Sequence, residues 1–180
     1  MAEFLKLCRT RRSVRRYAST PVPRECMDRC LEAARLAPSA CNSQPWSFVV
    51  ADSEPVRGRL AEAAFSGPYS MNRFALIAPV LIAVLTERSR FAAAVGGFFR
   101  GVQYNLIDVG IACEHLVLQA AEEGLGTCWL GWFNEKAVKK VLALPRAAHV
   151  DILISLGYPA DASPDRESAR KILDEIRSYL

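Results

Sequence analysis

The chain has 180 residues, a hydrophobic fraction of 51% and a formal net charge of +4. This length lies within the usual range of one domain, and this composition can build a continuous core, so we expect a single domain over residues 1–180. The longest apolar run, residues 74–85, is shorter than the roughly 20 residues that cross a bilayer, and no association with a membrane is expected.

The positive charge is concentrated near the N-terminus. Residues 1–40 hold nine Lys/Arg against four Asp/Glu, and the remaining chain holds 14 against 15. A local cluster of this kind can bind nucleic acid, an anionic membrane or a small phosphorylated ligand. Basic residues are not interleaved with aromatic ones elsewhere, so nucleic acid is not an expected partner.

The six cysteines are scattered through apolar or helical stretches, and no two have the CxxC spacing of a metal or redox motif. We therefore expect reduced thiols, a cytoplasmic location and no structural metal site. The cysteines are Cys8, Cys26, Cys30, Cys41, Cys113 and Cys128.

The first quarter of the chain predicts two helices and a strand. Apolar residues at helical spacing predict a short helix over residues 3–10, followed by an extended basic segment over 11–16. Prolines open a second helix after residue 23, and Pro38 ends it. A polar loop leads to a strand over residues 46–51, which is rich in aromatic and β-branched side chains.

The middle of the chain predicts a strand buried between helices. A helix is expected over residues 55–65, and the continuous apolar run after Pro79 is typical of a strand buried on both faces. Residues 104–123 give the strongest helical signal, with Leu106 first among its regularly spaced apolar positions. A short strand over 128–132 follows.

The last third predicts a helix, a strand and a final helix. Asn134 is placed to cap a helix over residues 135–144, and residues 149–157 form a strand. Residues 166–180 are expected to form a helix with one apolar face. Strands separated by helices in varied order favour an α+β fold.

The common catalytic motifs are missing from this sequence. Gly96 and Gly101 have the spacing of a phosphate loop, but Val102 stands where lysine is required, and no GxGxxG motif follows a strand. No GxSxG motif indicates a hydrolase. No acid, base or nucleophile is therefore assigned as catalytic.

Three other segments have the chemistry of a binding site. In the extended segment RRSVRRY, alternate side chains point the same way, so Arg11, Ser13 and Arg15 can converge on a phosphate. A solvated basic patch explains this segment alone equally well. The loop PSACNSQPW can offer Ser39 and Asn42 to the polar edge of a ring, and GLGTCWLGWF carries a glycine at a strand end that lets backbone approach a ligand.

Taken in order, these segments closely resemble the nitroreductase family of FMN enzymes. The resemblance covers nearly the whole chain and includes APSACNSQPWSFVV, EHLVLQAAEEGLGTCWLGWF, LGYP and a final RK. It implies a central mixed β-sheet covered by helices on both faces, an intertwined homodimer, and hydride transfer from NADH or NADPH through FMN to a small organic acceptor in a ping-pong reaction.

The resemblance also implies cofactor-binding residues in four groups. The phosphate and ribityl end of FMN would meet the basic segment and two residues near the C-terminus, and the ring would lie between a loop of the partner subunit and the end of a strand. These residues are Arg11, Arg12, Ser13, Arg15, Arg170 and Lys171 for the phosphate end, Pro38, Ser39, Ala40 and Asn42 from the partner, and Trp129, Leu130 and Gly131 on the other side.

Alternatives remain open at this stage. The same cofactor can serve dehalogenation or flavin fragmentation, and a noncatalytic flavin-binding or redox-sensing protein would share the motifs. The segment between the buried strand and the long helix is short, and substrate identity is expected to depend on it. Phe91, Phe98, Phe99 and Tyr104 are candidates for its wall.

Overall fold

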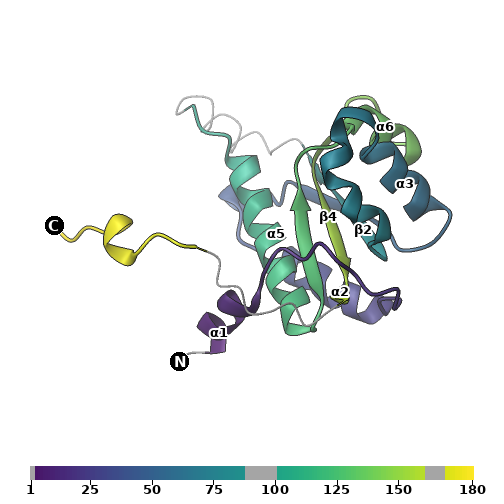
Figure 1. The fold of residues 1–180 in the computed structure, drawn as a ribbon. Helices are drawn as coiled ribbons and strands as arrows, with labels where there is room; N and C mark the ends of the chain where they lie inside the picture. The colour runs from purple at the N-terminus through teal and green to yellow at the C-terminus, as the bar shows by residue number, and fades with distance from the viewer. Residues whose placement is uncertain (1–2, 88–100, 161–168) are drawn as a thin grey trace.

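The computed structural model describes residues 3–87, 101–160 and 169–180, so the predicted wall residues Phe91, Phe98 and Phe99 lie outside the described residues. Helices cover both faces of one sheet (Figure 1). Within the described ranges the helices are α1 (Glu3–Thr10), α2 (Arg24–Arg35), α3 (Val56–Ala64), α5 (Tyr104–Glu122) and α6 (Glu135–Val141). The strands are β1 (Trp46–Ala51), β2 (Val80–Thr86), β3 (Gly126–Leu130) and β4 (His149–Gly157), and the 3-10 helices are η1 (Ala40–Asn42), η2 (Gly67–Ile77) and η3 (Leu173–Glu175).

The four strands form a sheet in the order β1-β2-β4-β3, with antiparallel pairing throughout. A parallel bridge between Ser13 and Thr127 adds the N-terminal segment beside β3 and makes the sheet mixed. β2 is buried along nearly its whole length, as its unbroken apolar run predicts.

Alternate residues of the sheet enter two separate cores. On one face Ile82, Val84 and Ile154 pack against α2 and α5, and on the other Leu81 and Leu153 pack against α3 and α6. This period of two follows from the pleat of a strand. Figure 1 shows the two helical layers on either side of the sheet.

Most predicted elements form where the sequence places them, with small shifts at their ends. The strand predicted over 128–132 begins at Gly126 and ends at Leu130. Asn134 caps α6, and its side-chain oxygen accepts a hydrogen bond from the Ala137 N–H at 3.1 Å. Leu106 is exposed, contrary to its predicted core position, because the buried stretch of α5 starts at Asp108.

The prediction of a helix over residues 166–180 is wrong for the described part of that range. Residues 169–180 run away from the body of the molecule as an extended tail, and only η3 is helical (Figure 1). Ile172, Leu173 and Ile176 are 63–66% exposed. A short helix whose apolar face has no surface to cover is unstable in water, which explains the extended form.

The six cysteines are free thiols, with Cys30, Cys113 and Cys128 buried. Within the described residues, no helix combines the length and the apolar character needed to cross a membrane.

Candidate functional site

The basic N-terminal segment lies along the free edge of β3. The Val14 N–H donates a 2.8 Å hydrogen bond to the Thr127 carbonyl, next to the Ser13–Thr127 bridge. Val14 and Tyr17 point inward and are buried, whereas Ser13, Arg15 and Arg16 are exposed. The segment therefore presents its polar side chains outward from a fixed backbone.

Two glycines make this close packing possible. A Cβ on Gly126 would lie 2.4 Å from a methyl carbon of Val14, and a Cβ on Gly157 would lie 2.4 Å from Pro79 and 3.1 Å from the Tyr17 ring. Only a residue without a side chain leaves room there. Gly126 of the GLG motif and Gly157 of the LGYP motif thus leave the space that the buried side chains of Val14 and Tyr17 occupy.

Ser13 and Arg15 meet around the thiol of Cys128. Burial raises the pKa of this thiol, and the charge of Arg15 and a hydrogen bond from Ser13 oppose that rise. The Arg15 guanidinium carbon lies 5.9 Å from the centre of the Phe74 ring, within the range of a cation–π contact. Both side chains therefore act electrostatically on Cys128 of β3.

The predicted phosphate-binding arginines differ in exposure. Arg11 and Arg12 are half-buried and Arg15 is exposed. Within the described parts of the chain, no carboxylate forms an ion pair with Arg11 or Arg15. Guanidinium and hydroxyl groups are donors suited to the oxygens of a phosphate, and this segment carries both types.

The loop that the sequence assigns to the ring has a strained backbone. Cys41, Asn42 and Gln44 have φ values of 52°, 51° and 46°, in the left-handed region that favours glycine. The Ser39 hydroxyl oxygen accepts a 2.9 Å hydrogen bond from the Gln44 N–H. The Asn42 side-chain oxygen accepts one of 3.0 Å from the Gln44 amide. Asn42 is exposed, and its NH₂ group can donate two hydrogen bonds.

Asp108 of α5 holds this loop in place through hydrogen bonds. It is 4% exposed, and both of its carboxylate oxygens lie 3.1 Å from the Ala40 N–H. The Ser43 hydroxyl donates a longer bond of 3.4 Å. Sequence reasoning missed Asp108. The sequence signal for it was a carboxylate within the apolar pattern of the predicted core helix. A buried carboxylate is stable only when hydrogen-bond donors surround it, so such a position indicates an anchoring contact.

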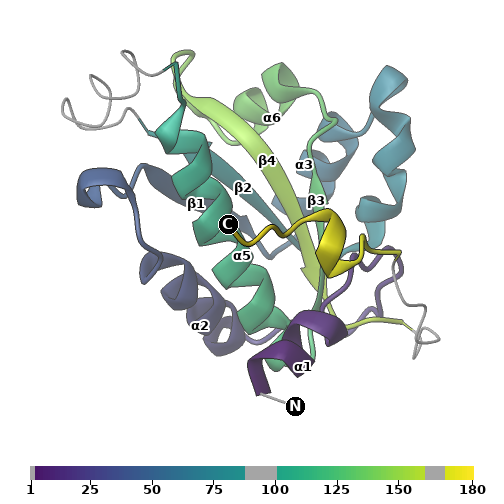
Figure 2. The same cartoon turned by 90° about the vertical axis from the view of Figure 1, so that its left-hand side faces the viewer.

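The loop and the arginine segment lie at opposite edges of the sheet. The loop precedes β1, one edge strand, and the arginine segment borders β3, the other edge strand (Figure 2). One chain therefore does not bring Pro38, Ser39, Ala40 and Asn42 to Arg15. A site built from both segments would need a second subunit.

The end of β3 presents mainly backbone to a ligand. Trp129 is 37% exposed, but the Leu130 side chain is 1% exposed and packs in the core on the α3 and α6 face. Only the backbone of Leu130 can therefore meet a ligand. Gly131 is exposed, and the nearest atom to a Cβ built on it is 3.9 Å away, so its backbone is open to approach.

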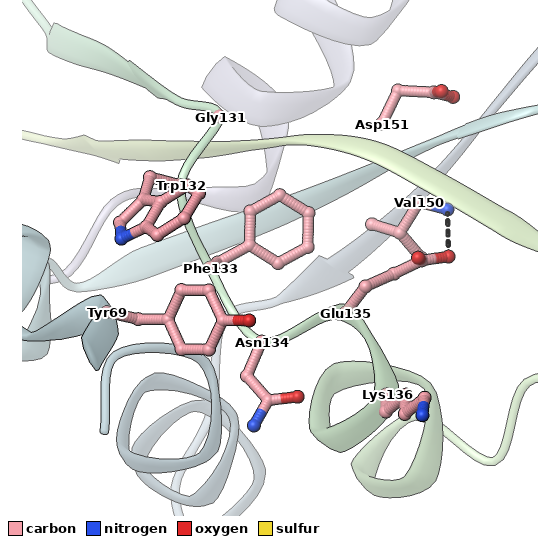
Figure 3. A pocket seen from close by; sticks show the side chains of 9 residues that line it. All are labelled: Tyr69, Gly131, Trp132, Phe133, Asn134, Glu135, Lys136, Val150 and Asp151. Atoms are coloured by element: carbon pink, nitrogen blue, oxygen red, sulfur yellow. Dashed lines mark hydrogen bonds between the residues drawn. The ribbon is translucent and has the colours of Figure 1, made fainter. Parts of the chain in front are cut away.

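A pocket of about 480 Å³ lies beyond Gly131 (Figure 3). η2 fixes one wall, because Asn72 donates a 2.9 Å hydrogen bond to the Trp132 carbonyl and the Trp132 indole donates one of 3.1 Å to the Pro68 carbonyl. The sequence predicted neither η2 nor these contacts. The pocket is lined by Tyr69, Gly131, Trp132, Phe133, Asn134, Glu135, Lys136, Val150 and Asp151.

Arg170 and Lys171 are exposed and lie at the start of the tail formed by residues 169–180 (Figure 1). Arg170 donates a 3.1 Å hydrogen bond to the carbonyl of Ala169.

Comparisons with known proteins agree on one family. The model of the nitroreductase family matches residues 8–158. A protein of Archaeoglobus fulgidus, provisionally named an NADH dehydrogenase/NAD(P)H nitroreductase, is 33% identical over 89% of this chain and 88% of its own. Iodotyrosine deiodinase 1 of Rattus norvegicus is 30% identical over 97% of this chain and 68% of its own. A solved structure from Exiguobacterium sibiricum, in complex with FMN, matches with a TM-score of 0.80 and 26% identity, covering 100% of this chain and 98% of that one. The chain belongs to the nitroreductase family.

Proposed function

We propose that this protein binds FMN at the β3 edge and acts as an NAD(P)H-dependent oxidoreductase. The observation that carries the proposal is the basic segment fixed to β3, in which Ser13 and Arg15 both act on Cys128 and neither Arg11 nor Arg15 has a carboxylate partner in the described chain. Guanidinium groups bind phosphate through charge-assisted hydrogen bonds. The relative from Exiguobacterium sibiricum, in complex with FMN, supports the identity of the ligand.

The residues at the end of β3 suit the other end of the same ligand. The exposed backbone of Gly131 can donate an N–H to a ring, and Trp129 offers an exposed aromatic surface beside it. The chemistry that bound FMN supplies is hydride transfer from NADH or NADPH to a small organic acceptor such as a nitroaromatic, a quinone or a flavin. The chain then has to bind and orient its ligands, and it needs no catalytic acid or base.

We propose that a homodimer completes the site. Exposed apolar side chains occur on α1, on the first turn of α5 and on the tail, and these elements share the face toward the viewer in Figure 2. A second copy covering this face would bring its loop of Pro38, Ser39, Ala40 and Asn42 toward the ring. Arg170 and Lys171 could likewise reach a phosphate only after the tail folds against a subunit. The exposed apolar residues are Phe4, Leu5, Leu106, Ile107, Ile172, Leu173, Ile176, Tyr179 and Leu180.

The first test is an absorption spectrum of the freshly purified protein, followed by anaerobic mixing with NADH and with NADPH. We expect a flavin spectrum that bleaches with at least one nicotinamide. A colourless protein that takes up no added FMN would overturn the proposal, and a protein that holds FMN but is reduced by neither nicotinamide would indicate the noncatalytic alternative.

A variant tests the phosphate assignment directly. Arg15→Ala should lower FMN affinity by about 10- to 150-fold, because a hydrogen bond to a charged group contributes about 1.5–3 kcal/mol. Arg59→Ala, which removes an exposed arginine from α3, is the matched control and should leave FMN affinity unchanged. Equal affinities of the Arg15 variant and the parent protein would refute the assignment.

Reductive dehalogenation is a second candidate reaction, favoured by the relative named iodotyrosine deiodinase 1. In that reaction two electrons and a proton replace carbon–iodine by carbon–hydrogen and release iodide. Chemically reduced protein offered iodotyrosine and a nitroaromatic in parallel separates the two. Iodide release without consumption of the nitroaromatic would favour dehalogenation, and the reverse would favour nitroreduction.

A further inference from the structure

Tyr17 closes a turn around Arg15. Its ring is buried at 6% exposure, and its hydroxyl lies 2.8 Å from the Val14 carbonyl and 2.8 Å from the Ser155 hydroxyl. A tyrosine hydroxyl has one proton. Donation to the Val14 carbonyl, with acceptance from Ser155, satisfies both neighbours at once. The turn that this bond spans contains Arg15 and Arg16.

The rest of the segment is held by backbone bonds on both sides of this turn. The Val14 N–H bonds to Thr127 on β3, and the Ala18 N–H bonds to the Tyr158 carbonyl at 2.9 Å. The Tyr17 hydroxyl adds a side-chain contact that joins the two ends across Arg15 and ties them to β4 through Ser155. Ser155 itself is fully buried, so this anchor is rigid.

Tyr17 is suited to a positioning role at any ordinary pH. Burial raises its pKa well above that of a free tyrosine, so the hydroxyl keeps its proton and remains a donor. The exposed side of the same turn carries Arg15, whose guanidinium shares the surroundings of Cys128 with Ser13. A change in the turn would therefore move one phosphate donor relative to the other.

We propose that Tyr17, anchored by Ser155, is a positioning residue that sets the geometry of Arg15 for the phosphate group of the flavin. This inference rests on the proposed function, because the phosphate is that of FMN. Its consequence is selective: Tyr17 contributes to the binding of a phosphorylated flavin and not to the binding of the flavin ring.

The test is a fluorescence titration of the full-length apoprotein with FMN and with riboflavin, which lacks the phosphate. Tyr17→Phe keeps the ring and removes the hydroxyl. We expect its FMN affinity to fall about fivefold, the effect of one hydrogen bond, while its riboflavin affinity stays within twofold. Tyr158→Phe is the matched control next to the same segment, and it should leave both affinities unchanged.

The other possible results would contradict either the positioning role or the proposed function. An unchanged FMN affinity of Tyr17→Phe, or equal losses for FMN and riboflavin, would overturn the positioning role. Parent protein that binds neither flavin would overturn the proposed function itself and this inference with it. If Tyr17→Phe fails to fold, Ser155→Ala removes the anchor instead, and it should reduce the preference for FMN over riboflavin. An undiminished preference would again overturn the inference.

Discussion

Gly126→Ala tests whether the arginine segment is seated on β3 as described. The added Cβ would lie 2.4, 2.7 and 3.0 Å from three carbons of Val14, where ordinary contacts are at 3.4 Å or more. Val14 is β-branched and its Cβ is among these atoms, so rotation of the side chain cannot relieve the clash. The segment must move away from the strand by about 1 Å, which breaks the 2.8 Å hydrogen bond from Val14 to Thr127.

The expected cost combines overpacking with the loss of that bond. Overpacking of a core costs about 1–3 kcal/mol and a lost hydrogen bond about 1 kcal/mol. A total of about 2–4 kcal/mol corresponds to a decrease in Tm of about 4–16 °C for a chain of this size. Thermal and urea unfolding, followed by circular dichroism, measure both quantities, and FMN affinity should fall together with them.

The control is the same substitution where no atom obstructs the new Cβ. A Cβ on Gly110 of α5 would meet no atom within 4 Å, and alanine is favoured over glycine in a helix by about 0.5–1 kcal/mol. Gly110→Ala should therefore leave Tm unchanged or slightly raised. Equal stability of Gly126→Ala and the parent protein would show that Val14 does not pack on β3. The assignment of the cofactor site to the β3 edge would then be refuted.

Three further predictions concern other parts of the molecule. Asp108→Ala removes the acceptor of the Ala40 N–H and should lower the free energy of unfolding in urea by about 1–3 kcal/mol, and unchanged stability would contradict the anchoring role. Hydrogen bonds from Arg29 lower the pKa of Glu123 to about 2 from its ordinary 4.5, so this pair stabilises the fold above pH 4.5 and is lost as pH falls toward 2. Tm measured from pH 5 to pH 2 should therefore fall more steeply in the parent protein than in Arg29→Ala, and parallel curves would refute the pairing. Replacement of both Ile172 and Ile176 by serine should raise the monomer fraction in analytical ultracentrifugation, whereas an unaltered dimer would exclude the tail from the interface.

The sequence predicted correctly those elements that depend on residues close to them in the sequence. The unbroken apolar run of β2 and the cap at Asn134 both depend on rules of short range, and both occur as expected. η2 was missed because a run of 3-10 turns has no apolar period. Its contacts with Trp132 arise only when residues 60 positions apart in the sequence meet.

The candidate site likewise has one part that the local sequence predicted and another that depends on long-range contacts. The alternation of RRSVRRY predicted that Ser13 and Arg15 share an exposed side; both are exposed and Val14 between them is buried, but the period of two ends there, because Arg16 is exposed and Tyr17 is buried. The sequence did not show that Val14 pairs with Thr127 or that Tyr17 reaches Ser155, 138 residues away, because such contacts depend on the register of the folded sheet.

The failed prediction at the C-terminus has a different physical origin. Ile172, Leu173 and Ile176 have the spacing of an amphipathic helix, whose apolar face needs a surface to pack against. The body of one chain does not provide that cover, since all three side chains remain exposed. The loop around Asn42, at the opposite sheet edge from Arg15, is separated from its predicted site in the same way. The proposed homodimer accounts for both observations, because a second copy of the chain would offer a surface to the tail and its loop to the β3 edge.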